Sequence, residues 1–361
     1  TSAALVRGFD KLSRSGWRKG IAATNPAQPE LVEGGRPYGA FEVTRLNAML
    51  LGALLVAVPL SLLAGRVWLD PFSDLPANAL VIFADLRLPR AILAITLGAG
   101  LGAAGAAMQG YLRNPLADPG LFGIAPGAAL GAVLTFWTGW AATAWALPAF
   151  ALVGAAAAMA LLGLIAGRTG SVMLFTLAGM MIASLAGALM SLAISLAPTP
   201  FAMSEIVTWL MGALADRSWR EVTFAVPLTL AGIGLLVLAG KSLDALSLGE
   251  AAARSLGVDP GRLQWLMIAG VGLTVGAGVA AAGIIGFVGL IVPHLLRRYT
   301  DRRPSSLILP SALAGALLLL LADSLCRVLP LASELRLGIA LSLLGAPFFL
   351  ALLLRMRRGL A

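Results

Sequence analysis

Apolar stretches of about twenty residues recur along this chain from Leu46 onward. Each is long enough to cross the ~30 Å hydrocarbon core of a bilayer as a helix. The eighth stretch is short, and we expect it to be partly broken. The pattern predicts an all-α polytopic membrane protein with ten spans, near residues 47–65, 88–109, 120–140, 142–166, 172–197, 221–240, 264–285, 286–297, 306–326 and 337–354.

Two segments interrupt this pattern. The run SEIVTWLMGAL (204–214) is apolar but too short to cross, which predicts a buried or interfacial helix with Ser204 as N-cap and Glu205 in its first turn. Residues 1–45 hold seven Lys/Arg, four Asp/Glu and the breaker-rich run NPAQPELVEGGRP, without an apolar stretch of signal-peptide length. They predict a flexible cytoplasmic leader, with a folded module as the alternative, ahead of a transmembrane domain at 46–361.

An internal repeat divides the spans into two halves. GAGLGAAG (98–105) is echoed by GAGVAAAG (276–283), and ten residues after each block comes a proline, Pro115 and Pro293. Five spans, an odd number, separate the blocks, so two five-helix repeats would lie inverted in the membrane, as in many transporters. The alternative is chance similarity between Gly/Ala-rich helices, whose small residues allow close packing in either case.

Composition narrows the possible functions. Hydrophobic residues make up 59% of the chain and charged residues 12%, and a single Cys and a single His exclude a disulfide framework or a Cys/His metal cluster within one chain. The net charge of +9 is explained by the excess of Lys/Arg in cytoplasmic loops. With both termini in the cytoplasm, 19 Lys/Arg lie inside and seven outside. No basic stripe interleaved with aromatics occurs, so we expect no nucleic-acid partner.

The stretch GLLVLAGKS (234–242) ends like a nucleotide-binding P-loop. Five residues instead of four separate Gly234 from the Gly-Lys pair, and they are all apolar. We interpret it as a helix exit in which Lys241 anchors the cytoplasmic end.

A series of motifs carries a family resemblance. They are RLPRAILAITLGAGLGAAGAAMQGYLRNPLADPGLFGIAPGAALGA (87–132), GIIGFVGLIVPHLLRR (283–298), LPSALAGALLLLLAD (309–323) and ELRLGIALSLLGAPFF (334–349). In this order, over roughly residues 47–356, the chain resembles the FecCD-type permeases, the membrane subunits of bacterial ABC importers for iron–siderophore complexes, haem and cobalamin. The resemblance implies an inner-membrane homodimer of ten-helix subunits, two cytoplasmic ATPase subunits and a periplasmic substrate-binding protein. It implies no cofactor and no catalysis by this chain.

The resemblance also assigns candidate sites. The polar loop 243–263 looks like a coupling helix that docks on the ATPase: an amphipathic helix at 248–256 would pair Glu250 with Arg254 and end at Gly257. An ordinary capped surface helix is the alternative. The candidate coupling residues are Leu248, Gly249, Glu250, Ala252, Arg254, Leu256 and Gly257.

Three arginines lie on the outer side against the positive-inside tendency, Arg87, Arg90 and Arg327. In the cobalamin branch of the family, arginines at these positions pair with acidic residues of the binding protein, and a guanidinium suits bidentate carboxylate pairing. Snorkelling towards lipid headgroups is the alternative.

In the family the fifth span lines the pathway, with a gate near the turn before it. Candidate pathway and gate residues are Thr169, Ser171, Met180, Met181 and Ser184, with plain packing as the alternative. We interpret Gln109, Asn114, Pro115, Pro293 and His294 as structural motif residues, and His294 as structural rather than a haem ligand.

Few ionisable groups fall within the spans. Asp323, which we expect to pair with Arg327 at i, i+4, is the clearest. A proton-coupled secondary transporter, the alternative class, would need an intramembrane relay. The sequence therefore predicts an importer permease for an iron chelate, either a ferric siderophore or haem, with cobalamin as the alternative substrate.

Overall fold

The computed structural model describes residues 40–65, 68, 79–166, 171–331 and 333–360, within a compact unit that spans Tyr38–Ala361. Residues 1–39 of the predicted leader lie outside the described residues. Within the described ranges all regular structure is helical, which confirms the all-α prediction.

Ten helices correspond to the ten predicted spans. Eight are long and apolar enough to cross a membrane. The other two, α5 and α12, have only 14 and nine residues, so the third span is shorter than predicted and the eighth is short as expected. In order these are α2 (Ala40–Leu63), α4 (Leu88–Tyr111, preceded by α3, Ala79–Val81, and a π-helical turn, Ile82–Arg87), α5 (Ile124–Trp137), α6 (Ala146–Ala166), α7 (Val172–Ser195), α9 (Trp219–Leu246), α11 (Pro260–Ala282), α12 (Val288–Leu296), α13 (Pro304–Val328) and α14 (Leu337–Leu360).

Two further helices lie between the spans, α8 (Pro200–Leu210) and α10 (Glu250–Ser255). The predicted start of α8 was wrong. Thr199, not Ser204, is the N-cap: its side chain accepts a hydrogen bond from Ala202 N at 3.1 Å, and Pro200 occupies the first turn, where its missing N–H costs nothing. Glu205 therefore lies mid-helix.

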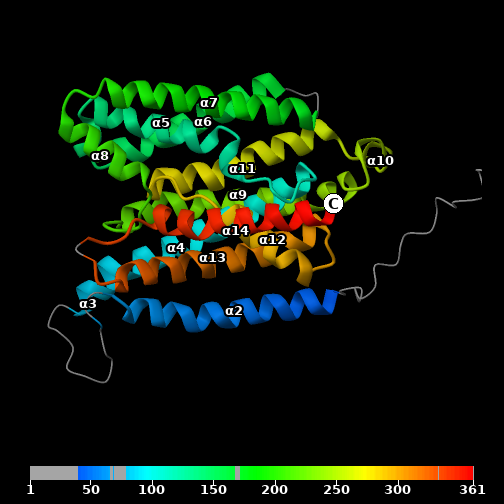
Figure 1. Cartoon of the computed structure of the whole chain (residues 1–361), viewed down its shortest axis with the longest axis horizontal. Coiled ribbons are helices and arrows are strands. Elements are labelled where there is room, and N and C mark those ends of the chain that lie inside the picture. Colours follow the sequence, from blue (N-terminus) through cyan, green and yellow to red (C-terminus); the bar gives the residue numbers. More distant parts are fainter. Residues whose placement is uncertain (1–39, 66–67, 69–78, 167–170, 332, 361) are drawn as a thin grey trace, which may run out of the picture. The chain divides into compact units, whose positions relative to one another are not determined.

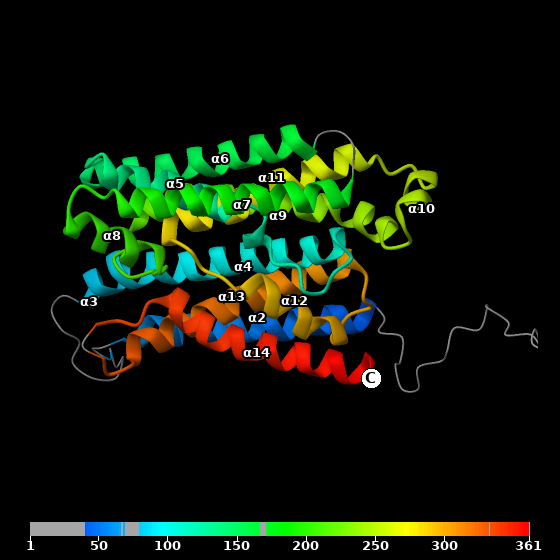
Figure 2. The same cartoon turned by 45° about the horizontal axis from the view of Figure 1, so that its top comes forward.

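The spanning helices run side by side, and the two ends of the bundle differ (Figure 1). One end carries α10 and the last turn of α14, and we call it the α10 end. The opposite end carries α3 and α8, and we call it the α8 end. Turning the molecule shows the extended segments that lead into α12 and towards α5 (Figure 2).

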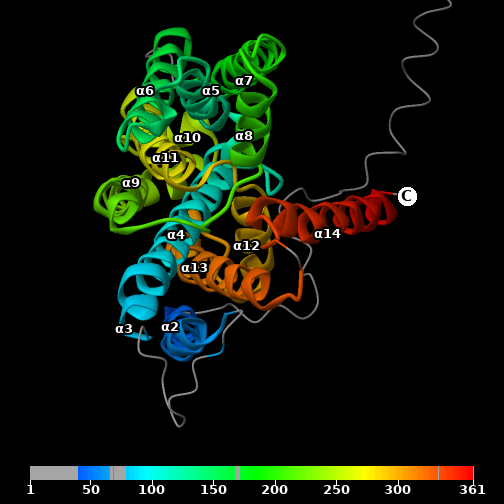
Figure 3. The ribbon, with the colours of Figure 1, turned by 90° about the vertical axis from the view of Figure 1, so that its left-hand side faces the viewer.

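Helix α4 lies at the centre of the bundle and packs against α13, α9, α12 and α11 (Figure 3). Glycines make this packing close. A Cβ added to Gly98, Gly102 or Gly105 would lie 2.3, 2.0 or 2.0 Å from the carbonyl oxygens of Gly315, Ser311 and Gly289. The backbones are thus in direct contact, as helix association in lipid favours.

The two halves are α2 and α4–α7, then α9 and α11–α14. Helix α4 runs towards the α10 end and α11 runs away from it (Figure 1). Each half contains a short helix that begins at a residue with positive φ, Gly123 (+82°) and Phe287 (+67°). The matched prolines have different settings, however, since Pro115 lies in the α4–α5 connection and Pro293 lies inside α12. The inversion is a property of the helices rather than of the prolines.

Candidate functional site

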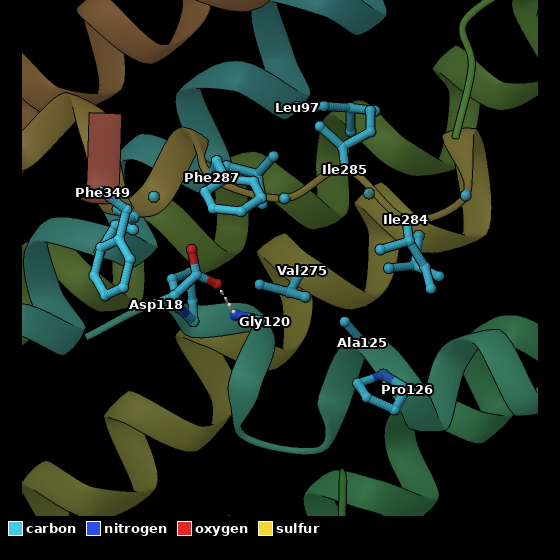
Figure 4. A pocket seen from close by; sticks show the side chains of 18 of the residues that line it. Leu97, Asp118, Gly120, Ala125, Pro126, Val275, Ile284, Ile285, Phe287 and Phe349 are labelled. Carbon is cyan, nitrogen blue, oxygen red and sulfur yellow. Dashed lines mark hydrogen bonds between the residues drawn. The ribbon is translucent and has the colours of Figure 1, made fainter. Parts of the chain in front are cut away.

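A cavity of about 430 Å³ lies where the two short helices begin (Figure 4). Its walls are mostly apolar, and the Asp118 carboxylate faces it while accepting a hydrogen bond from Gly120 N at 2.7 Å. Ala125 and Pro126 come from the first turn of α5 and Gly289 from that of α12. The cavity is lined by Leu97, Leu101, Leu116, Asp118, Pro119, Gly120, Ala125, Pro126, Val275, Gly278, Val279, Gly283, Ile284, Ile285, Gly286, Phe287, Gly289, Leu290 and Phe349.

Backbone breaks create this cavity. Gly283 ends α11 with φ +76°, and an extended stretch then leads to Phe287, which caps α12. Irregular backbone of this kind is tolerated at membrane depth only where it is buried in protein or lines a cavity. The N-termini of two helices, each with partial positive charge, therefore meet beside one cavity.

The predicted motif residues hold α12 in place. Gln109 Nε2 donates to the carbonyl oxygens of Leu290 (3.3 Å) and Gly289 (3.4 Å), and its Oε1 accepts from Arg297 Nη2 at 2.9 Å. Asn114 Oδ1 accepts from Leu116 N and so closes the turn that contains Pro115. His294, in the last turn of α12, stacks edge-on with Phe348 at 5.9 Å between ring centroids. Within the described ranges there is no group of three or more His, Cys, Asp or Glu that suits a metal.

The candidate pathway residues lie on an exposed face of α7. Met180 is 47% and Met181 72% exposed, Ser184 is also exposed, and Ser171 is the N-cap of α7, accepting from Leu174 N. Thr169 lies outside the described residues. A second exposed apolar face lies on α14, which packs against α12 and α13 and projects from the bundle in the end view (Figure 3). The large exposed side chains of these two faces are Met173, Leu177, Met180, Met181, Leu185, Leu189 and Leu192 on α7, with Leu343, Leu344, Leu350, Leu353 and Leu354 on α14.

An aromatic cluster connects α4, α5 and α7. The Tyr111 ring meets the Phe175 ring edge-on at 5.2 Å, and Phe175 lies 5.5 Å from Phe122, which directly precedes the start of α5. Tyr111 and Phe175 are almost fully buried. A narrow seam also brings Tyr111 and Val172 together with Glu250 and Ala253 of α10. Helix α10 therefore lies close to the first turn of α7.

The helix bounds and side-chain pairing in the predicted coupling loop differ from the prediction. Helix α10 covers 250–255 rather than 248–256, and Gly249 (φ +107°) and Gly257 (φ +84°) bound it, so Gly257 stops the helix as expected. Glu250 does not pair with Arg254: it faces Arg113 at 3.9 Å. Ala252 is half-buried and Arg254 exposed, while the flanking Leu248 and Leu256 are 69% and 64% exposed beyond the last turn of α9.

The three predicted docking arginines lie at the α8 end, where Arg87 and Arg327 are buried and Arg90 is half-buried, and each is engaged within the chain. Arg90 forms a bidentate pair with Asp323 at 2.9 Å and contacts Glu334 at 2.9 Å, and Arg327 Nε lies 3.2 Å from Asp323, which confirms that predicted pair. Arg87 donates to the carbonyl oxygens of Leu62 and Leu63 at the end of α2. Arg327 likewise donates to Ala64 O and Ser61 Oγ.

These arginines therefore serve two structural purposes. Arg87 and Arg327 satisfy carbonyl oxygens at the C-terminus of α2, where cations are favoured. Arg90 and Arg327 share the fully buried Asp323 carboxylate. The sequence analysis missed Glu334 and Asp118, because a carboxylate in a loop gives no signal of its partner or of the cavity it faces.

Fold and site together define a polytopic transport protein: two inverted halves, broken helices around a membrane-depth cavity, and an apolar face left exposed. The family model described as the FecCD transport family matches residues 52–355. The chain belongs to this family of ABC transporter permeases and is a multi-span protein of the inner membrane, as the resemblance indicated.

Similar proteins agree with this assignment. The vitamin B12 import system permease protein BtuC of Vibrio cholerae is 39% identical over 318 residues, 86% of this chain and 94% of that protein. The uncharacterised ABC transporter permease protein YvrB of Bacillus subtilis is 39% identical over 284 residues, 77% and 80% of the two chains. A solved inward-facing structure of a metal-chelate type ABC transporter superposes with a TM-score of 0.80 at 34% identity, covering 86% of this chain and 99% of that one.

Proposed function

We propose that this permease moves an iron chelate, a ferric siderophore or haem, from periplasm to cytoplasm as a homodimer powered by two separate ATPase subunits. The observation that carries the proposal is the coupling segment. Leu248 and Leu256 are exposed beyond the end of α9, outside the lipid-facing part of the bundle. Exposed leucines in water mark a docking surface, and the ATPase is the partner that this family supplies.

The charge distribution supports a cytoplasmic α10 end and both termini in the cytoplasm. At the α8 end, Arg90 and Arg327 pair with Asp323, Glu334 also contacts Arg90, and Arg220 pairs with Glu221. Positive charge concentrates at the α10 end, as cytoplasmic loops require. The cations there are Arg113, Lys241, Arg254, Arg262, Arg297, Arg298, Arg302 and Arg303.

The exposed faces of α7 and α14 are together the proposed homodimer and pathway surface. Its methionines and leucines offer flexible, apolar contacts on which a bulky chelate slides without strong binding. The cavity beside Asp118 reaches α14, since Phe349 of α14 lines it.

Docking of a periplasmic binding protein on Arg87, Arg90 and Arg327 remains a proposal, and the geometry restricts how it works. Arg90 is 11% exposed in its side chain, and its outer partner Glu334 is 30% exposed. An acidic residue of the binding protein therefore reaches Arg90 by replacing Glu334. Reversing Arg90 to Glu without any loss of binding-protein affinity would overturn this proposal.

The transport function is tested by reconstituting the chain with its neighbouring ATPase in liposomes. We expect substrate-stimulated ATP hydrolysis coupled to uptake, and we expect Leu256→Asp to abolish assembly with the ATPase. Ser255→Asp, an equally exposed change on the same helix, is the matched control. Uptake by the chain alone, driven by a proton gradient, would instead support a secondary transporter.

Cobalamin import is the second candidate, and the vitamin B12 permease among the relatives favours it. Screening the binding protein for tryptophan quenching by haem, ferric siderophores and cobalamin separates the two. Nanomolar binding of cobalamin alone would replace the iron-chelate proposal.

A further inference from the structure

A second cleft, of about 280 Å³, lies at the α8 end between α8, the α8–α9 connection and the residue before α14. Hydrogen bonds fix its base: Gly338 N donates to Gly212 O and Ala213 N donates to Ala282 O. It is lined by Phe136, Ser204, Glu205, Thr208, Trp209, Ala213, Ala215, Asp216, Arg217 and Arg336.

Two arginines in this cleft differ in their partners from Arg90, Arg220 and Arg327, which each pair with a carboxylate. Arg217 and Arg336 are half-buried, and within the described residues neither has a carboxylate within ion-pair distance. The hydrogen bond of Arg217 is a long one, 3.5 Å to Ala213 O. Burial lowers the pKa of the Arg217 guanidinium, and the neighbouring Arg220 and Arg336 lower it further, although Glu221 and Asp216 act in the opposite direction. Two like charges, partly removed from water, are thus held together.

Further donors surround the pair. Ser204 and Thr208 contribute hydroxyl groups from α8, and the buried indole N–H of Trp209 has no acceptor among the described residues. The two acidic lining residues, Glu205 and Asp216, are exposed. A ligand with acceptor oxygens satisfies the inner groups, because a desolvated cation is stabilised by a charge-assisted hydrogen bond.

We propose that this cleft binds a carboxylate arm of the transported chelate on the periplasmic side, so that the permease prefers an anionic iron–carboxylate chelate to a neutral one. This inference rests on the proposed iron-chelate import. The cleft is too small for a whole chelate and fits one arm, while the bulk of the molecule meets the neighbouring aromatic side chain of Phe136.

The test measures binding of radioiron-labelled ferric citrate to the full chain in nanodiscs by equilibrium dialysis, without the binding protein. A neutral tris-hydroxamate iron chelate is the comparison probe. Because each charge-assisted hydrogen bond contributes roughly tenfold to hundredfold in affinity, Arg217→Gln with Arg336→Gln should weaken citrate binding at least tenfold and leave hydroxamate binding unchanged.

Two control variants test whether charge in the cleft determines the affinity for ferric citrate. Glu205→Gln with Asp216→Asn removes the rim charges that repel an anion and should tighten ferric citrate binding severalfold. Arg303→Gln should have no effect, because that exposed guanidinium lies at the opposite end of the bundle. Equal binding of the two chelates, or citrate binding that survives the double arginine change, overturns the proposal.

The same variants separate a ligand site from a protein-docking site. Loss of binding-protein affinity with unchanged citrate binding would assign the cleft to the binding protein and refute the substrate assignment. ATP-driven uptake by the reconstituted complex, without any preference for an anionic chelate, would refute the cleft site alone and leave the proposed function intact.

Discussion

Asp323 should be the most sensitive carboxylate of the transmembrane domain. It is fully buried, its two oxygens both lie within 3.0 Å of Arg90 Nε, and Arg327 Nε lies 3.2 Å from the second oxygen. Asp323→Asn keeps the shape of the side chain but removes the negative charge that Arg90 and Arg327 share. Removing one partner of a buried ion pair costs about 3–5 kcal/mol.

The structure indicates the lower part of this range. Arg90 keeps Glu334 at 2.9 Å, and Arg327 keeps its bonds to Ser61 Oγ and Ala64 O, so each cation retains part of its stabilisation. We therefore expect a loss of about 3 kcal/mol in the free energy of unfolding. Equilibrium unfolding in mixed micelles with increasing SDS, followed by tryptophan fluorescence, measures this quantity.

A matched variant provides the scale. Asp301 faces Arg303 at 3.6 Å in an exposed pair at the opposite end of the bundle, and exposed pairs contribute about 0–1 kcal/mol. Asp301→Asn should therefore change the free energy of unfolding by less than about 1 kcal/mol. If Asp323→Asn costs no more than Asp301→Asn, the reasoning about the buried network is refuted.

Two other predictions concern packing and coupling. Gly102→Ala places a Cβ about 2.0 Å from Ser311 O and forces α4 and α13 apart, so it should lower the free energy of unfolding by about 1–3 kcal/mol in the same assay. Gly52→Ala, with open space at its Cβ, should be nearly neutral. Equal effects of the two changes would contradict the close contact between α4 and α13. Phe175→Leu removes the edge-on contact with Tyr111 and should lower the amount of substrate transported per ATP more than it lowers ATP hydrolysis, measured in proteoliposomes. An unchanged ratio would show that the aromatic cluster only packs.

The spans were predictable because each is decided by local composition. Twenty apolar residues form a helix in lipid whatever lies beside them, and the eighth span was recognised as short because its apolar stretch has only about twelve residues. The start of α8 was misplaced because Ser204 and Thr199 are both good N-caps, and only Pro200 next to Thr199 distinguishes them.

Contacts between residues far apart in the chain could not be predicted from the sequence. Arg90 and Asp323 are 233 positions apart, and nothing local announces their contact. The pairing of Asp323 with Arg327 was predictable because a helix brings residues at i and i+4 together. Glu250 instead contacts Arg113 rather than Arg254, because the turn after α4 comes close to α10. The violation of the positive-inside tendency drew attention to these arginines, but it gave no indication of their partners within the chain.

The aromatic cluster links α10 to the start of α5, beside the cavity. Movement of α10 acts on Tyr111 and Val172 through the seam they share with Glu250 and Ala253. Tyr111 contacts Phe175 on α7, and Phe175 contacts Phe122. Phe122 packs so closely on Gly179 that a Cβ there would lie 2.8 Å from its ring, and Gly123, the next residue, is the hinge at which α5 begins. Because packed side chains transmit displacement rather than absorb it, we expect a shift of α10 to move α7 and the cavity end of α5 together. Both move relative to α12, which Gln109 fixes to α4.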